Sequence, residues 1–189
     1  MSYKLYYFDV YGRAEPIRML LWHAKQEFED VRLSPEDFGK LKEEGKLEFG
    51  QVPALEIDGK QYTQSHAILR LLGRKFGYYP ETDLDAAWKI DSTLDSITDL
   101  VALMLKIKNE PEETKKASLE NFLGNTLPKW LTAISKRVSE NGNNGFLVGD
   151  KETVADFSFN ALLSATFFNE GSEYSAFLKP IFEKFENLV

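Results

Sequence analysis

Tyr7 is the residue whose chemistry can be predicted most directly, because it stands near the end of an aromatic run, residues 3–8, that is typical of a β-strand. A phenol hydroxyl at a strand end can donate a hydrogen bond to a sulfur anion, and this bond favours the ionised form of a thiol. Lowering a thiol pKa from about 8.5 by roughly two units is worth about 2.7 kcal/mol. A charge-assisted hydrogen bond contributes about 1.5 to 3 kcal/mol, so Tyr7 and the positive end of the following helix can supply that amount. Because Tyr6 and Tyr7 alternate on the strand, one of the two phenols can instead be a core residue.

Two further segments carry residue types that can hold a polar ligand. Gln64 and Ser65 stand at the start of a helix, where free N–H groups and the helix dipole attract an anion. Ser65 can also be a plain N-cap, and the two roles are compatible at one helix start. Gln51-Val52-Pro53 precedes a strand, and the sequence alone favours an ordinary turn there.

The composition limits the chemistry that this chain can do. Its 189 residues include no cysteine, so there is no disulfide, thiolate metal site or redox dithiol, and any reacting thiol must arrive as a substrate. A formal net charge of -7 argues against nucleic acid and acidic membranes as partners. No stretch approaches the twenty or so apolar residues of a membrane span, and the N-terminus lacks a secretory pattern. We therefore expect a globular protein of the cytoplasm.

The first 77 residues predict the elements that position Tyr7. We expect strands and helices in the order β-α-β followed by β-β-α, which is the order of the thioredoxin-like fold. The predicted elements are a strand over 3–8, a helix opened by Glu15-Pro16, a strand over 28–33, a loop with a short helix over 36–50, a hairpin of 54–57 and 60–63, and a helix from Ser65 to a stop at Gly77. Pro80 and the polar residues after it indicate a linker, so the predicted domains are 1–79 and 82–189.

The second half predicts helices only. A 4-3-4-3 apolar stripe indicates a long bundle helix through Ile90, Leu94, Ile97, Val101 and Met104. We expect a second helix over 112–141 with a kink at Pro128, a capping sequence over 153–156 that opens a core helix reaching Phe167, and a last amphipathic helix from Phe177 to Val189. The predicted fold is thus an α/β thioredoxin-like N-terminal domain followed by an all-α helical-bundle C-terminal domain.

The motifs taken together resemble the glutathione transferases. The resemblance rests on Leu5-Tyr6-Tyr7-Phe8, Gly12-Arg13-Ala14-Glu15, Gln51-Val52-Pro53 and Gln64-Ser65. It is strongest to the sigma class, which includes glutathione-dependent prostaglandin D synthases, because a tyrosine stands where other classes have serine or cysteine. The resemblance implies a homodimeric enzyme that joins the glutathione thiolate to hydrophobic electrophiles, with Tyr7 as the catalytic residue.

The resemblance also implies site residues. Glutathione would be bound by Tyr7, Arg13, Phe38, Lys42, Gln51, Val52, Pro53, Gln64, Ser65 and, from the partner subunit, Asp99. Pro53 would follow a cis peptide bond, so that the Val52 backbone pairs with the tripeptide. Phe38 replaces the usual tryptophan and keeps only a packing role. The electrophile would meet Tyr11, Arg13, Leu103, Met104 and Lys106.

Glutathione is the implied co-substrate, with no tightly bound cofactor and no metal. Asp95 and Asp99 match two of three carboxylates that hold a divalent ion in some prostaglandin synthases, but Thr98 replaces the third. Two alternatives stay open on the sequence. One is a glutathione-dependent isomerase such as a prostaglandin D synthase, and the other is a non-catalytic crystallin or binding protein of the same fold.

Overall fold

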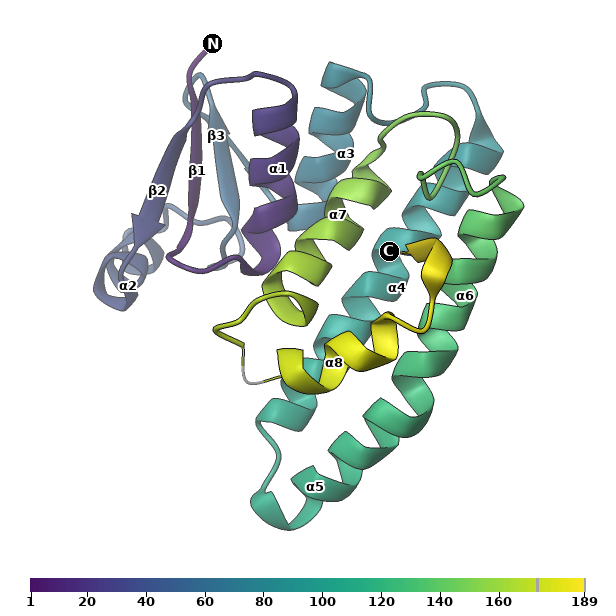
Figure 1. Ribbon diagram of the computed structural model, residues 1–189. Helices are drawn as coiled ribbons and strands as arrows, with labels where there is room; N and C mark the ends of the chain where they lie inside the picture. Colours follow the sequence, from purple (N-terminus) through teal and green to yellow (C-terminus); the bar gives the residue numbers. More distant parts are fainter. Residues whose placement is uncertain (173, 189) are drawn as a thin grey trace. The chain divides into compact units, whose positions relative to one another are not determined.

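The computed structural model describes residues 1–172 and 174–188, and its chain divides into two compact units, an N-terminal unit of residues 1–81 and a C-terminal unit of residues 82–189 (Figure 1). The N-terminal unit contains a four-stranded mixed sheet in the order β2-β1-β3-β4. Its elements are β1 (Tyr3–Phe8), α1 (Glu15–His23), β2 (Glu29–Leu33), α2 (Pro35–Glu43), β3 (Ala54–Ile57), β4 (Lys60–Thr63) and α3 (Ser65–Phe76), with a 3-10 turn over Gly12–Ala14. The thioredoxin-like prediction is confirmed.

The two neighbouring tyrosines of β1 lie on opposite faces of this sheet. Strand β1 runs parallel to β2 and antiparallel to β3, and Tyr7 pairs with Arg32 while Tyr6 pairs with Val31. The face that carries Tyr7 is covered by α1 and α3 (Figure 1), and the fully buried tyrosine on it is Tyr3. Tyr6 and Tyr7 are both only half-buried, so neither is a core residue in the usual sense.

The start of α3 differs from the prediction. Ser65 is the first helical residue and not the N-cap; Gln64 takes that position, with a backbone φ of 68°. An N-cap normally has extended backbone and a side-chain oxygen that accepts from the first turn. Gln64 has neither feature, because its left-handed backbone turns the chain sharply out of β4. The predicted stop at Gly77 is confirmed, with a φ of 83°.

The described residues of the C-terminal unit form helices joined by loops and contain no strand. It contains α4 (Leu84–Lys108), α5 (Glu112–Asn121), α6 (Leu127–Glu140), α7 (Val154–Leu162) and α8 (Ser175–Phe182), two π-helical turns over Phe122–Thr126 and Leu163–Phe167, and a 3-10 turn over Glu186–Leu188. The buried residues of α4 confirm the predicted stripe in its first half. In its second half Leu100 and Ile107 are buried, whereas Val101 and Met104 are half-buried. None of the described helices is both long enough and apolar enough to cross a membrane.

The predicted helix over 112–141 is present as a continuous helical run over 112–140, but it contains a π turn that we did not predict. Pro128 lies in the first turn of α6, and the π turn over Phe122–Thr126 comes just before it. A proline has no N–H, so the carbonyl four residues earlier loses its α-helical partner. One residue before this proline the chain closes a wider ring, in which the N–H of Leu127 donates to the carbonyl of Phe122.

The last helix is shorter than predicted. It ends at Phe182, and the 3-10 turn that follows contains Asn187, whose side chain bonds to the Ser135 hydroxyl at 2.7 Å and to the Ser135 carbonyl at 2.9 Å. These bonds hold the chain end against α6 and replace a continued helix. Val189, the predicted end, lies outside the described residues.

The capping sequence before α7 is confirmed as a reciprocal capping box. The Asp156 carboxylate accepts from the Thr153 N–H and from the Leu147 N–H, each at 2.8 Å. Burial raises the pKa of Asp156, and these hydrogen bonds act in the opposite direction. The box therefore ties the start of the core helix to the preceding loop.

Candidate functional site

The Tyr7 hydroxyl is held by the backbone of the turn that follows β1. The Arg13 N–H donates to Tyr7 Oη at 3.2 Å. A phenol oxygen that accepts such a bond still has its own hydrogen to donate. The Arg18 guanidinium carbon lies 5.9 Å from the centre of the Tyr7 ring. The Tyr7 hydroxyl therefore keeps its own hydrogen for donation to another group.

Gly12 makes room for this arrangement, a role that sequence reasoning missed. Its φ is +48°, and a Cβ atom at Gly12 would lie 2.6 Å from Tyr7 Oη and 2.9 Å from the ring carbon Cε1. Side-chain-bearing residues rarely adopt this backbone conformation, and real Cβ contacts are never this short. The phenol therefore rests directly on the Gly12 backbone.

Lys42 is placed by a second glycine that we did not predict. Phe38 packs against Phe8 with ring centres 5.2 Å apart and edge-to-face geometry, which holds α2 against β1. Lys42 lies in the last turn of α2, and its stem crosses Gly50, where an added Cβ would lie 3.3 Å from Lys42 Cε. The exposed ammonium group is consequently kept beside the segment that leads into β3.

The segment before β3 and the start of α3 come together. Gln64 Nε2 donates to Gln51 Oε1 at 3.4 Å, and both side chains are exposed. The Gln64 backbone, with φ 68° and ψ 108°, is in a region that costs a non-glycine residue about 1 to 3 kcal/mol and that clusters at ligand sites. The Gln64 side chain makes no capping hydrogen bond to α3, whose first-turn N–H groups lie at this junction.

The Val52–Pro53 peptide bond is cis, as the resemblance implied. Pro53 is buried and Val52 is half-buried. Within the described part of the chain, the Val52 N–H and C=O make no backbone or side-chain hydrogen bond. An extended peptide can therefore pair with this residue by main-chain bonds.

The remaining predicted residues are divided between the two units. Tyr11 is 48% exposed and precedes Gly12 in the turn after β1, so it belongs to the same region as Tyr7. In the C-terminal unit, Asp99 is exposed on α4, Leu103 is half-buried and Lys106 is exposed. No group of three or more histidine or carboxylate side chains in residues 1–172 and 174–188 is arranged to hold a metal ion.

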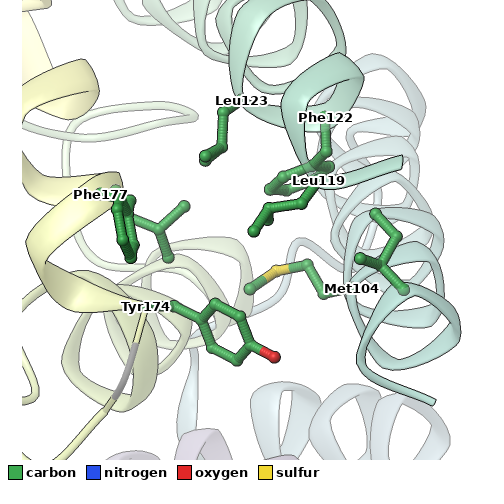
Figure 2. A pocket seen from close by; sticks show the side chains of 8 residues that line it. Met104, Leu119, Phe122, Leu123, Tyr174 and Phe177 are labelled. Atoms are coloured by element: carbon green, nitrogen blue, oxygen red, sulfur yellow. The ribbon is translucent and has the colours of Figure 1, made fainter. Parts of the chain in front are cut away.

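Met104 is the predicted acceptor residue that the structure places in a pocket. Figure 2 shows its thioether among apolar side chains of α5, of the first π turn and of the α8 region. The cavity is about 20 Å³ and is lined by Met104, Ile107, Leu119, Phe122, Leu123, Tyr174, Phe177 and Leu178. Leu103 and Lys106 do not line it. Sequence reasoning missed this grouping because its members come from α4, from residues 119–123 and from the α8 region, which are far apart in the chain.

Comparisons with known proteins agree with this arrangement. The family model described as "Glutathione S-transferase, N-terminal domain" matches residues 3–74, and the one described as "Glutathione S-transferase, C-terminal domain" matches residues 93–189. A probable glutathione S-transferase of Caenorhabditis elegans is 40% identical over 160 residues, which cover 82% of this chain and 75% of that protein. S-crystallin SL11 of Nototodarus sloanii is 35% identical over 164 residues, covering 86% of this chain and 78% of that protein. The structure of prostaglandin synthase D of Nilaparvata lugens matches with a TM-score of 0.82 and 32% identity, covering 100% of this chain and 89% of that one.

Proposed function

Because the chain belongs to the glutathione S-transferase family, we propose that its N-terminal unit binds glutathione and that Tyr7 stabilises the thiolate that attacks a hydrophobic electrophile. The observation that supports Tyr7 most directly is the 3.2 Å bond from the Arg13 N–H to its oxygen. This bond leaves the phenol hydrogen free to donate to sulfur. Glutathione is the co-substrate, and no tightly bound cofactor is required.

The tripeptide would lie along the groups that surround Tyr7. The Lys42 ammonium would pair with the glycyl carboxylate, beside Phe38, which fixes α2. The Val52 backbone, before cis Pro53, would bond to the cysteinyl residue as an added strand does. The γ-glutamyl carboxylate would meet the uncapped first turn of α3, at Ser65, with Gln51 and Gln64 beside it.

The reaction transfers no electrons to or from the protein. The thiol of bound glutathione gives its proton to solvent, and the sulfur lone pair forms a bond to an electrophilic carbon while the leaving group departs with its bonding pair. Tyr7 favours the thiolate by donation, and Arg13 lies beside it. Binding also replaces a bimolecular encounter by a positioned attack. Positioning and thiolate formation together supply the rate.

We assign the electrophile side of the reaction to Tyr11, Arg13, Leu103, Met104 and Lys106. Support comes from the exposure of Tyr11 in the turn beside Tyr7. This part of the proposal is tested by the KM for the electrophile, which should rise in Tyr11→Ala and Met104→Ala while the KM for glutathione stays within about twofold.

We further propose a sigma-class homodimer of the cytoplasm, in which Asp99 reaches the ligand of the partner subunit. Exposed apolar side chains on α4, at Leu84, Trp88 and Leu105, support a subunit contact along this helix. Sedimentation velocity across a wide concentration range tests the dimer, and a monomer at every concentration would contradict it.

A second candidate is a glutathione-dependent isomerase, which the match to a prostaglandin synthase D supports. In that case the thiolate would form an S–O bond to one endoperoxide oxygen as the O–O bond breaks. Loss of the proton from the carbon that bears this oxygen would then form a C=O bond, and the thiolate would leave with the S–O electron pair. A binding protein without turnover is a third candidate, since an S-crystallin is among the relatives. Product analysis with an aryl halide and with an endoperoxide distinguishes these three functions.

The deciding experiment is steady-state conjugation of glutathione to chlorodinitrobenzene across pH, with the parent, Tyr7→Phe and Tyr6→Phe. Tyr6→Phe is the matched control, because it removes a phenol hydroxyl from the neighbouring residue, which lies on the opposite face of the same strand. We expect Tyr7→Phe to lower kcat/KM by a factor of about 10 to 100, since it removes one charge-assisted hydrogen bond. Tyr6→Phe should stay within about twofold of the parent.

Glutathione affinity, measured by calorimetry on all three proteins, separates binding from chemistry. If Tyr7→Phe binds glutathione like the parent but loses turnover and shows a higher thiol pKa, the mechanism holds. If Tyr7→Phe and Tyr6→Phe have the same kcat/KM, Tyr7 is not the thiolate-stabilising group. A parent that binds glutathione without turning over any electrophile would indicate the binding protein.

A further inference from the structure

Arg18 is a charged residue buried in the apolar stretch of α1. It is only 7% exposed. Its Nε donates to the Asp30 carboxylate at 3.0 and 3.2 Å, and its Nη1 donates to Glu15 Oε2 at 3.0 Å. The Tyr7 ring centre lies 5.9 Å from the guanidinium carbon. Arg18 therefore joins α1 to β2 beneath the catalytic strand.

The same nitrogen also binds the backbone of the turn after β1. Nη1 of Arg18 donates to the carbonyl of Val10 at 3.0 Å and to the carbonyl of Tyr11 at 3.2 Å. The Tyr11 carbonyl accepts a second bond, from the Glu15 N–H at 3.2 Å. These bonds orient two consecutive peptide groups immediately before Gly12. The residue after Gly12 is Arg13, whose N–H holds the Tyr7 oxygen.

Stability alone explains this arrangement poorly. A buried ion pair is often replaceable by apolar residues of similar volume with little loss of stability. Here the desolvation cost is not fully offset, because Nη2 of Arg18 is buried and has no hydrogen-bond partner among the described residues. What the guanidinium supplies, and an apolar residue cannot, is a fixed orientation of two loop carbonyls.

We propose that Arg18 is a positioning residue for Tyr7: it holds the Val10 and Tyr11 carbonyls so that the Arg13 N–H points at the phenol oxygen. This inference rests on the proposed role of Tyr7 in stabilising the glutathione thiolate. Arg18 acts through the backbone, since it lies under the Tyr7 ring and the donors on its Nε and Nη1 are used by the loop and by two carboxylates. A lysine at this position keeps the charge but lacks the planar set of donors. Those donors reach the Asp30 and Glu15 carboxylates and the carbonyls of Val10 and Tyr11.

The test compares Arg18→Lys with Arg32→Lys. Arg32 is the matched control, because its Nη2 lies 2.6 Å from the same Asp30 carboxylate while none of its bonds reaches the Val10 or Tyr11 carbonyl. Two quantities are measured on the full chain: the hydrogen exchange rate of the Arg13 amide in the free protein, and the pH dependence of thiolate absorbance for bound glutathione.

For Arg18→Lys we expect Arg13 amide exchange to be faster by about tenfold, because the loop samples conformations that break its bond to Tyr7. The apparent pKa of the bound thiol should rise by about half to one pH unit, with glutathione Kd changed by less than about threefold. Arg32→Lys should leave both quantities as in the parent. In a Tyr7→Phe background Arg18→Lys should no longer change the thiol pKa, since the two residues act as one unit.

Parental amide exchange and a parental thiol pKa in Arg18→Lys would overturn the inference. Equal changes in both arginine variants would also overturn it, because they would trace the effect to the Asp30 ion pair. If Arg18→Lys does not fold, Glu15→Ala replaces it. This variant removes the carboxylate that anchors Nη1 and should shift both quantities in the same direction by a smaller amount, and unchanged values refute the proposal. A parent without thiolate absorbance refutes the proposed function, while Arg13 exchange still decides the role of Arg18.

Discussion

Replacing Gly12 by alanine tests the close contact between this residue and the Tyr7 phenol. The new methyl carbon would lie 2.6 Å from Tyr7 Oη, and ordinary contacts begin at 3.4 Å, so the two groups must separate by 3.4 − 2.6 = 0.8 Å. Either the phenol withdraws from the turn or the turn moves away from β1. In both cases the bond from the Arg13 N–H, already 3.2 Å long, is lost.

The magnitude follows from two separate costs. A left-handed backbone costs alanine about 1 to 2 kcal/mol relative to glycine, and this lowers the free energy of unfolding. A displacement of nearly 1 Å in a catalytic group can reduce the rate by about 100-fold. We expect Gly12→Ala to lower kcat/KM by a factor of about 10 to 100, equivalent to about 1.4 to 2.7 kcal/mol of transition-state stabilisation.

The assay is conjugation of glutathione to chlorodinitrobenzene, paired with urea unfolding of the same samples. Gly59→Ala is the control: Gly59 has a φ of +81° with no atom near its missing Cβ, so this variant carries the backbone cost without the contact. It should lose about 1 kcal/mol of stability and keep its activity. Equal kcat/KM for both variants, or a Gly12→Ala value within about twofold of the parent, would refute the contact argument.

Two further predictions concern binding and stability. Lys42→Met should raise the Kd for glutathione about 5- to 30-fold with little change in kcat, because it removes a charge partner outside the reacting centre. Lys40→Met, on the same helix, should leave this Kd unchanged. Calorimetry measures the Kd and kinetics the kcat, and an equal rise in Kd for both variants would contradict the prediction. Asp156→Asn should lower the free energy of unfolding by about 1 to 3 kcal/mol at neutral pH, since an amide has one oxygen and can accept from only one of the two buried N–H groups, of Leu147 and Thr153. Because burial raises the pKa of Asp156, folding favours the protonated form of this carboxyl. The protonated carboxyl therefore contributes its full stabilisation below the unfolded-state pKa of about 3.9, and this stabilisation is lost as the pH rises through the raised pKa of the folded state. The stability difference between parent and Asp156→Asn should therefore narrow with increasing pH in urea titrations, and a widening difference would contradict the direction of the shift.

The sheet and the order of its elements could be predicted because their signals are local. Alternation in β1, the Asp58-Gly59 turn and the stop at Gly77 each depend on a few neighbouring residues. The capping box before α7 was predictable for the same reason, since its two partners are three residues apart. Local signals therefore predicted the fold class and the elements of the N-terminal unit, whereas the end of α8 was placed too late.

The site was predictable in its residue types but not in its geometry. The sequence contains Gly12 and Gly50, yet only the folded chain brings Tyr7 and Lys42 onto them. The left-handed backbone of Gln64 could not be read from a glutamine, which has no preference for it. Arg18 was missed because a lone arginine in an apolar helix indicates nothing until its partners on β2 and in the loop are known.

The π turns bear on how this chain can tolerate changes in length. A π turn accommodates one more residue than an α turn. The extra residue is therefore absorbed within the turn, and the helices on either side keep the same side chains directed at the core. Removing one residue within Phe122–Thr126 would convert the wide turn to an ordinary one and leave Leu131 and Ile134 directed at the core. The same deletion within α6 would rotate everything beyond it by about 100° and turn apolar side chains toward solvent. Single-residue gaps between this chain and its relatives should therefore be tolerated in the π turns and selected against in the α-helices beside them.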